Sequence, residues 1–314
     1  MKRILVLIVC VLTYSALPAQ NNEEKNATFQ LSIIPPLSTQ GAHSYQYTNT
    51  ISLNLLAGIS KNEKAVAWAG LANIILNDAS GLQMAGLTNY VGNEGKGFQS
   101  AGMVNVNRGK FTGFQMAGLG NVAKDVSGVQ LAGLVNIARN VSGVQFSGLV
   151  NIAENSDCPI GLINIIKNGE MGVAVTYDAL GSTVVSFRSG GKYTYGILGV
   201  GYNHKTDRHS RVAEGGLGAH IPIASWFRLN NELKVSAIGN DSDTPVLNAG
   251  YSLLPAFRIG KHVELFAGAG INYMETKDKS NYKMFPNHSL WKKTGTAKMQ
   301  QIYIGYQVGV QYIF

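Results

Sequence analysis

The residues with the clearest chemical potential are six charged side chains in the C-terminal half of the sequence. They are Glu214, Arg228, Glu232, Lys234, Arg258 and Glu264. Each falls on the polar position of a segment in which apolar residues alternate, and successive side chains of a β-strand point to opposite faces. If these strands close into a barrel, three acids and three bases project inward. They would line a polar pore or pair with one another and plug it, and pairing is favoured because buried charges persist chiefly as pairs.

A second candidate is the connection formed by residues 276–298, which combines aromatic and basic side chains. Its candidate binding residues are Tyr282, Phe285, Trp291, Lys292 and Lys293. This composition would suit an anionic glycan or a lipopolysaccharide head group. The alternative is a solvated loop without a ligand.

Motifs for catalysis or cofactor binding are absent from the sequence. The six histidines have no metal-ligand spacing, and there is no nucleophile elbow, phosphate-binding loop or dinucleotide fingerprint. The net charge is +8, but no clustered nucleic-acid-binding pattern accompanies it. The sequence therefore predicts a protein that is not an enzyme, uses no cofactor or metal, and does not bind nucleic acid.

The last 15 residues show best which elements would position these charges. Every second residue from Ile302 to Phe314 is apolar, while the intervening residues are mostly Gly and Gln. A transmembrane β-strand has this period, with apolar residues toward lipid and polar or small residues toward the lumen. The terminal aromatic residue resembles the signal by which bacterial outer-membrane proteins are recognised. Tyr306, Tyr312 and Phe314 are therefore the predicted assembly signal, with the β-barrel assembly machinery as partner.

The connections between the C-terminal strands alternate in length. Residues 189–191, 224–226 and 260–262 form short connections, and residues 203–210, 239–244 and 276–298 form longer ones. Outer-membrane barrels have short periplasmic turns and long outer loops. The pattern thus predicts a periplasmic C-terminus and an extracellular loop at residues 276–298.

A repeat, Gly-x-Gln-x-Ala-Gly-Leu-x-Asn, occupies the middle third of the sequence. Its clearest copies begin at Gly81, Gly97, Gly113, Gly128 and Gly143, and its period is 15–16 residues. Each copy would form one strand of an antiparallel meander or one coil of a β-solenoid. In a solenoid Gln130 would lie beside Gln145, whereas in a meander the two would be about 20 Å apart. The meander is favoured because the flanking strands are antiparallel and the polar face suits a lumen.

Residues 1–19 have the features of a secretory signal peptide, with Lys2-Arg3 followed by a short apolar run. After residue 20 no apolar run approaches the length of a transmembrane helix. The predicted divisions are a signal peptide at 1–19, N-terminal strands at 20–64, the repeat region at 65–168 and barrel strands at 169–314.

The predicted fold is therefore all-β, an antiparallel transmembrane β-barrel of about 16 strands built partly from the repeats. That count treats residues 171–188 as one bulged strand, since splitting it would place the termini on opposite sides of the membrane. The alternative fold is a repeat β-solenoid joined to a smaller barrel.

The repeat copies resemble those of surface-repeat proteins from Gram-negative outer envelopes. The segments GLINIIKNGE (161–170) and FRSG (187–190) resemble the region that follows such repeats, so the resemblance covers roughly residues 27–200. It implies export to the envelope and brings no catalytic residues. The expected function is a non-enzymatic outer-membrane barrel in contact with outer-membrane lipid, as a pore or a structural envelope component. The alternative is a solenoid binding or adhesion module anchored by a small barrel.

Overall fold

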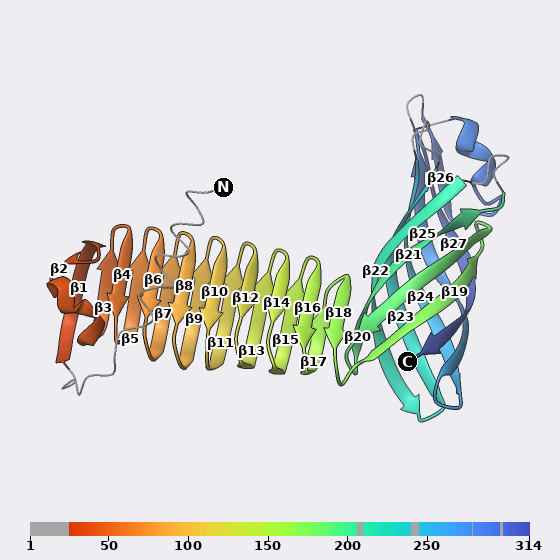
Figure 1. Cartoon of the computed structure of the whole chain (residues 1–314). Helices are drawn as coiled ribbons and strands as arrows, with labels where there is room; N and C mark the ends of the chain where they lie inside the picture. The colour runs from red at the N-terminus through yellow and green to blue at the C-terminus, as the bar shows by residue number, and fades with distance from the viewer. Residues whose placement is uncertain (1–24, 206–209, 240–244, 278, 296–297) are drawn as a thin grey trace.

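The computed structural model describes residues 25–314 except for 206–209, 240–244, 278 and 296–297. The signal peptide expected at residues 1–19 thus lies outside the described residues. Among the described residues the fold is almost entirely β-structure, arranged as a long solenoid that joins a barrel (Figure 1).

The solenoid consists of stacked coils, each contributing a longer strand to one sheet and a short strand to a second sheet. The ten-stranded sheet contains β1 (Lys25–Ile34), β2 (Leu37–Ser38), β3 (Tyr47–Asn54), β5 (Asn62–Ala69), β7 (Ala79–Ala85), β9 (Gly95–Ala101), β11 (Lys110–Ala117), β13 (Asp125–Ala132), β15 (Asn140–Ser147) and β17 (Asn155–Ile160). The eight-stranded sheet contains β4 (Ala57–Ser60), β6 (Ala72–Ile75), β8 (Thr88–Val91), β10 (Val104–Asn107), β12 (Gly120–Val122), β14 (Val135–Ile137), β16 (Val150–Ala153) and β18 (Ile163–Ile166). A short 3-10 helix, η2 (Gly41–Gln46), precedes β3.

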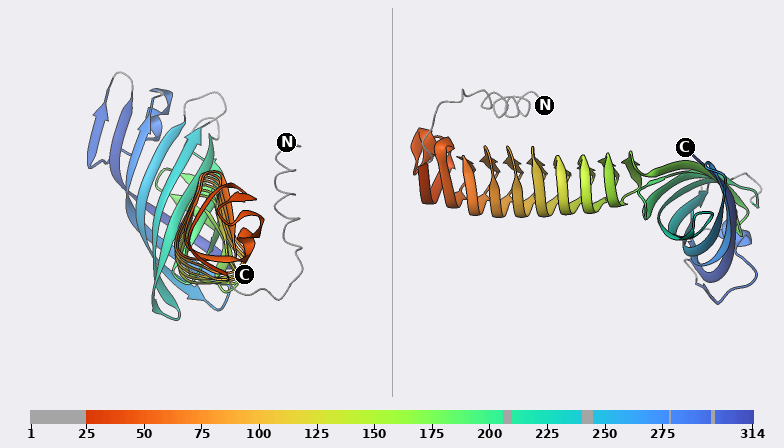
Figure 2. Two further views of the ribbon diagram at one scale, coloured as in Figure 1. Left: turned by 90° about the vertical axis from the view of Figure 1, so that its left-hand side faces the viewer. Right: turned by 90° about the horizontal axis from the view of Figure 1, so that it is seen from below.

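The repeats stack in parallel, so the expected antiparallel meander is wrong. Gln130 pairs with Gln145 in the β13–β15 ladder, and Asn136 pairs with Asn151 in the β14–β16 ladder. Seen along its axis, the solenoid shows its coils superposed (Figure 2). The physical reason is that parallel stacking brings identical amides together at every step, whereas a meander would separate them. With the repeats outside any barrel, the single barrel of about 16 strands is not formed, and the structure has the solenoid and smaller barrel given as the alternative.

Two ladders of amide side chains run through the solenoid interior. From Asn73 to Asn164, each repeat Asn donates through Nδ2 to the Oδ1 of the next Asn, at 2.8–3.0 Å. Gln145, Gln130 and Gln115 each donate in the opposite direction, toward the preceding Gln, at 2.8–3.1 Å. The repeat Asn and Gln side chains are fully buried. Because a buried amide without a partner is costly, each coil within the Asn ladder must carry an amide. The Gln ladder is shorter and runs from Gln99 to Gln145, beyond which Pro159 takes the Gln position.

The two glycines of the repeat are explained by close packing between coils. Gly128 has a φ of 138°, a region that favours glycine, and an added Cβ would clash with the carbonyl oxygen of Gly113. Gly133 lies at the corner between β13 and β14, where a Cβ would clash with the carbonyl oxygen of Gly118. We call this the Gly–Leu corner, since Gly133 and Leu134 and their equivalents form it in every coil.

The barrel is a closed antiparallel sheet that follows the solenoid directly. Its strands are β19 (Glu170–Asp178), β20 (Ser182–Gly190), β21 (Thr194–Asn203), β22 (Ser210–Ala224), β23 (Phe227–Gly239), β24 (Val246–Ile259), β25 (Val263–Thr276) and β27 (Met299–Ile313). Pairing of β19 with β27 closes these eight strands. A short strand, β26 (Trp291–Thr294), extends the sheet along β27, and η3 (Lys279–Met284) precedes it.

Residues 171–188 form two strands, so their interpretation as one bulged strand is wrong. The chain reverses at residues 179–181, where Ser182 N–H donates to the Asp178 carboxylate at 2.9 Å. The predicted alternation of connections still holds. The turns at 191–193, 225–226 and 260–262 share one end with the C-terminus, which we call the turn end. The other end, the loop end, is shared by residues 179–181, by the last residues of β21, β23 and β25, and by the first residues of β22, β24 and β27.

The last coil packs on the outer wall of the barrel near the turn end. Thr194 Oγ1 donates to the Pro159 carbonyl at 2.6 Å, and Asn164 Nδ2 donates to the Ser189 carbonyl at 3.0 Å. Asn164 is the final member of the Asn ladder, so a barrel strand terminates that ladder. The solenoid core and the barrel wall are therefore bonded to each other directly.

We predict that Asn136→Ala lowers the free energy of unfolding of the solenoid by roughly 2–3 kcal/mol, because Asn121 Nδ2, Asn151 Oδ1 and the Phe146 carbonyl each lose one hydrogen-bond partner inside the solenoid. Urea unfolding followed by circular dichroism measures this. Asn155→Ala is the matched control, since Asn155 is exposed and its loss should change stability by less than about 0.5 kcal/mol. Equal effects of the two substitutions would show that the ladder contributes no stability.

Candidate functional site

The six charges expected in the lumen do point inward, and they are paired. Lys234 Nζ lies 3.0 Å from Glu214 and 3.7 Å from Glu232. Arg228 Nε lies 2.7 Å from Glu264, and Arg258 Nη2 lies 3.9 Å from the same carboxylate. Glu232 and Glu264 are fully buried. Both carboxylates therefore depend on their partners for compensation.

Two further charged residues complete this network, and the sequence interpretation missed them. Arg188 from β20 is 2% exposed and lies 2.9 Å from Glu232. Its guanidinium also lies over the ring of Phe266, at 4.4 Å from the centroid. Glu170, at the start of β19, lies 2.6 Å from Arg228 and 2.7 Å from Arg258. Arg188 was missed because residues 171–188 were interpreted as one bulged strand, although Val185, Ser186, Phe187 and Arg188 do alternate in polarity. Glu170 was missed because it precedes that segment.

Aromatic and amide side chains fill the space beside the ion pairs. Tyr195 donates from its hydroxyl to Glu232 at 2.9 Å, and its ring stacks on His220 at 4.3 Å. His220 is hydrogen-bonded to Asn230 at 2.8 Å, and Asn230 donates to Glu264 at 3.1 Å. Ion pairs, rings and amides thus form one connected network across the lumen.

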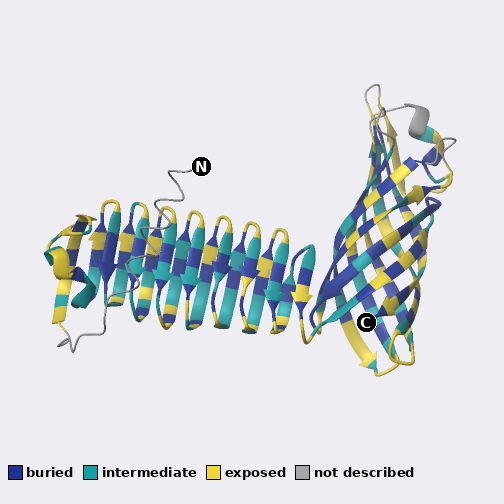
Figure 3. Cartoon of the chain, in the orientation of Figure 1, coloured by how far each residue is buried: buried dark blue, intermediate teal, exposed yellow. Residues whose placement is uncertain are grey.

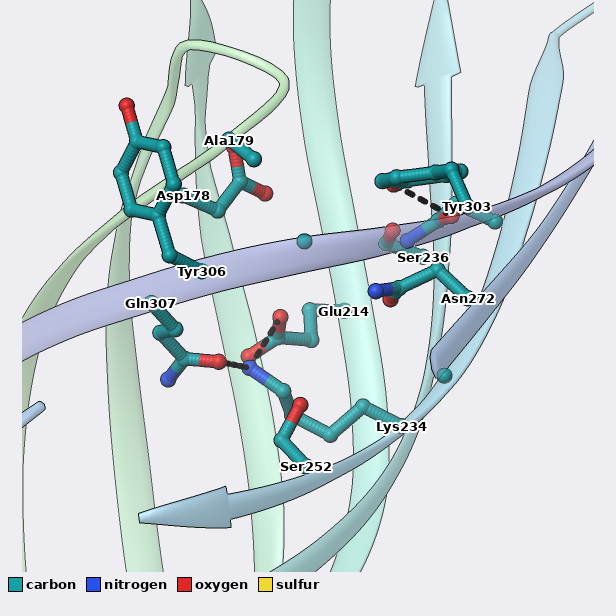
Figure 4. Close-up of a pocket in the computed structure, with 13 residues that line it drawn as sticks. Asp178, Ala179, Glu214, Lys234, Ser236, Ser252, Asn272, Tyr303, Tyr306 and Gln307 are labelled. Atoms are coloured by element: carbon teal, nitrogen blue, oxygen red, sulfur yellow. Dashed lines mark hydrogen bonds and ion pairs between the residues drawn. The ribbon is translucent and has the colours of Figure 1, made fainter. Parts of the chain in front are cut away.

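A small polar cavity adjoins the network and is lined partly by its members Glu214 and Lys234 (Figure 4). Asp178, Glu214, Lys234 and Gln307 are among its lining residues, and Lys234 Nζ donates to the Gln307 side chain at 2.7 Å. The cavity volume is ≈ 30 Å³, enough for a few water molecules.

The loop end of the barrel is closed by apolar side chains. Met284 and Phe285, from the connection after β25, are buried in a cluster of inward-facing barrel residues. The other members are Leu180, Val184, Val212, Ile238, Val246, Met274, Met299 and Tyr303, with Tyr282 packed against them. Gln301 Nε2 donates to the Pro286 carbonyl at 2.7 Å and holds this segment in place. The connection thus folds back into the barrel mouth.

This arrangement changes the expected binding surface in the 276–298 connection. Phe285 is only 7% exposed and serves the closure, so its expected role as an exposed binding residue is wrong. Tyr282 is half-buried. Trp291, Lys292 and Lys293 are exposed on β26. An anionic glycan or a lipopolysaccharide head group as their ligand stays a prediction.

The three residues of the expected assembly signal lie on the outside of the barrel. Tyr306, Tyr312 and Phe314 are 54–61% exposed, and the Tyr312 ring stacks on His262 at the turn end. Phe314 N–H donates to the Met171 carbonyl at 3.0 Å, where β27 meets β19. Their recognition by an assembly machinery stays a prediction, and the structure adds that this terminal segment closes the barrel.

A buried carboxylate also lies in the solenoid, outside the barrel. Glu63 accepts hydrogen bonds from Ser52 Oγ at 2.6 Å and Asn49 Nδ2 at 3.3 Å. Burial raises the pKa of Glu63 from 4.5 to about 7, against the opposing effect of these bonds. The folded coil therefore retains a proton at mildly acidic pH that the unfolded chain would release. The amides and hydroxyls around it belong to the structural core.

Comparison with known proteins identifies no family. The sequence matches no protein-family model and no curated protein. One similar solved structure is described as "De novo design of transmembrane beta-barrels", with 16% identity and a TM-score of 0.27. The match covers 46% of this chain and 93% of that chain. The resemblance to surface-repeat proteins therefore stays a prediction.

Metal-binding clusters and membrane-spanning helices are both absent from the residues that the structure describes. Those residues contain no group of three or more His, Cys, Asp or Glu side chains that could hold a metal ion. None of the helices they form is long and apolar enough to cross a membrane.

We predict that Glu232→Ala lowers the free energy of unfolding of the barrel by about 3–5 kcal/mol, because Arg188 would stay buried without its carboxylate. Urea titration of the gel-mobility shift between folded and unfolded barrel measures this. Arg139→Ala is the control, since its ion pair with Glu154 is exposed and contributes less than about 1 kcal/mol. A Glu232 variant as stable as the control would mean that the network does not hold the lumen together.

Proposed function

We propose that the barrel is a sealed outer-membrane anchor that carries the solenoid as a non-enzymatic structural arm of the envelope. The observation that carries this proposal is the combination of an apolar outer wall with a lumen filled by paired charges. A membrane anchor needs an apolar outer wall. A pore could not have a lumen that is filled by paired charges.

The outer wall supports the anchor role. Outward-facing residues of the barrel are exposed and predominantly apolar around the barrel, among them Val175, Val185, Val200, Ile223, Val235, Leu253, Leu265, Ile304 and Val310. At the turn end Trp226, Phe227 and Phe257 lie with ring centroids 5.0–6.1 Å apart. An apolar band flanked by aromatic residues is typical of outer-membrane barrels.

The lumen supports a sealed barrel rather than a pore. An eight-stranded barrel has an interior just wide enough for its own side chains. Here four glutamates pair with four basic residues, and Met284 and Phe285 close the loop end. A permeating solute would have to break buried ion pairs, which is strongly unfavourable.

The expected direction of the barrel in the membrane supports a periplasmic position for the solenoid. In outer-membrane barrels the short turns face the periplasm. The solenoid joins at the turn end, through the short segment between β18 and β19. It would therefore face the periplasm, and an arm inside the envelope fits better than an adhesin displayed outside the cell.

We predict that vesicles containing the folded protein take up small sugars no faster than empty vesicles. The same preparation should show a barrel that migrates differently in gels before and after heating, which confirms insertion. Liposome swelling measures the uptake, with a general porin as the positive control. Swelling above the empty-vesicle rate with a fully folded barrel would refute the sealed lumen.

We predict opposite accessibility for the two parts in intact cells. In a Cys158→Ser background, Lys293→Cys on β26 should react with a maleimide-linked polymer too large to cross the outer membrane. Lys124→Cys, in an exposed corner of the solenoid, should react only after that membrane is opened. Labelling of Lys124→Cys in intact cells would reverse the proposed orientation.

A further inference from the structure

The solenoid has an apolar ridge along its whole length, formed by the Gly–Leu corners. Its residues are Leu71, Leu87, Met103, Leu119, Leu134 and Leu149, each 40–47% exposed. Figure 3 shows the exposed corners as a row along the upper edge. Exposed apolar strips of this extent mark interaction surfaces.

The strand residues beside the ridge continue the apolar surface. On the longer strands the residue three positions before the ridge Leu faces outward, as in Trp68, Met84, Met116 and Phe146, all 37–47% exposed. On the short strands Val135 and Val150 face outward and Ile137 is exposed. The repeat Asn and Gln side chains of these strands are inside, in the amide ladders, whereas exposed polar residues such as Lys96, Lys110 and Ser142 lie at the other end of the longer strands. Around the ridge the repeat is therefore apolar outside and polar inside.

The opposite corner of each coil is charged and exposed. Its residues include Asp78, Glu94, Arg108, Lys124, Arg139, Glu154 and Lys167. The solenoid is thus amphipathic across its width, as an element lying in a membrane interface must be.

Contacts with the barrel show which way the ridge points. Near the turn end, a Cβ added at Gly191 would lie 3.1 Å from the Ser156 carbonyl oxygen, close to the charged corner. Further along β21, a Cβ at Gly196 would clash with the carbonyls of Gly161 and Leu162, in the last Gly–Leu corner. The ridge therefore points toward the loop end, along the outer wall of the barrel.

The ridge meets that wall between exposed apolar residues. Leu162 lies against Gly215, which pairs with Leu198, and Leu198 and Val200 are exposed on the loop side of the contact. On the other side Ile221 and Ile223 are exposed, closer to the turn end. Lipid that covers this wall would also reach the ridge.

We propose that the solenoid lies in the plane of the same membrane, with the Gly–Leu ridge in the hydrocarbon and the charged corners at the periplasmic interface. This inference rests on the proposed function, because it requires a membrane-inserted barrel. The occupant of the ridge is lipid, since the ridge is continuous with the apolar wall of the barrel.

The backbone of the ridge is compatible with hydrocarbon. The N–H groups of Gly133 and Leu134 donate to carbonyls of the preceding coil, at 3.2 and 3.0 Å. Their equivalents in the neighbouring coils do the same, as for Gly118 and Leu119. Hydrocarbon does not tolerate unpaired backbone donors. The corner can enter it because these N–H groups are already bonded.

Three single-tryptophan proteins test this proposal, because the natural tryptophans report on different parts. Trp68 lies beside the ridge, Trp226 at the turn end of the barrel and Trp291 on β26, and all three are 44–58% exposed. Replacing two of them by Phe in each protein leaves one reporter. Each protein is inserted into phosphatidylcholine vesicles whose acyl chains carry bromine, a quencher of tryptophan fluorescence.

The expected result is loss of Trp68 and Trp226 emission relative to vesicles without bromine, with Trp291 unchanged. Quenching of Trp226 without quenching of Trp68 overturns the in-plane solenoid and leaves the anchor intact. If neither is quenched, the anchor fails and the in-plane solenoid with it. Unquenched Trp68 in a particle with the mass of two chains would assign the ridge to a second copy, which also overturns the proposal.

Discussion

The hydrogen-bonded stacking of identical amides is the constraint on which the solenoid depends. Each repeat Asn is bonded to its equivalents in the coils before and after it, so the interior positions cannot change independently. The Asn and Gln ladders run in opposite directions, which sets their amide dipoles against each other. A buried apolar cluster that includes Phe111, Val126 and Val141 fills the interior near the charged corner. Near the Gly–Leu corner the interior positions hold amides and small residues, and the large apolar side chains there are on the outside. The amphipathic exterior is thus a consequence of the amide interior.

The barrel has the same inverted design, with paired polar groups inside and apolar groups outside. In the barrel lumen the paired groups are mainly ion pairs. Charged groups are more costly to bury than amides, so each buried charge needs a partner of opposite sign. Arg188 is central, because it bonds to Glu232 and stacks on Phe266 in the middle of the network. The junction joins the two interiors, since Asn164 ends the Asn ladder on the backbone of Ser189 in β20.

The barrel half could be predicted well from period and connection length, because each of its strands alternates independently of its neighbours. The inward position of Glu232 follows from the alternation of apolar and polar residues within its strand. The common end of the short turns follows from the alternation of short and long connections. The repeat half could not, since a strand of a meander and a coil of a solenoid share the same two-residue period. Only the contact between Gln130 and Gln145 distinguishes the solenoid from the meander. Short connections at both ends of each repeat were the one signal in the sequence that favoured the coil.

Phe285 and Arg188 show a second limit of sequence interpretation. Phe285 lies in a long polar connection, and nothing local indicates that the segment folds back into the barrel mouth. Arg188 was hidden by an incorrect strand boundary at residues 179–181. In both cases the decisive partners, such as Met274 and Glu232, lie far away in the sequence.

In the proposed arrangement, barrel and solenoid share one membrane through a continuous apolar surface. The most direct measurement is a cryo-electron microscopy reconstruction of the full chain in a lipid nanodisc, with the disc density retained. The disc should surround the barrel and extend along the solenoid, covering the Leu71 to Leu149 ridge and leaving the charged corners outside. A disc confined to the barrel, with the solenoid standing clear of lipid, would contradict this arrangement.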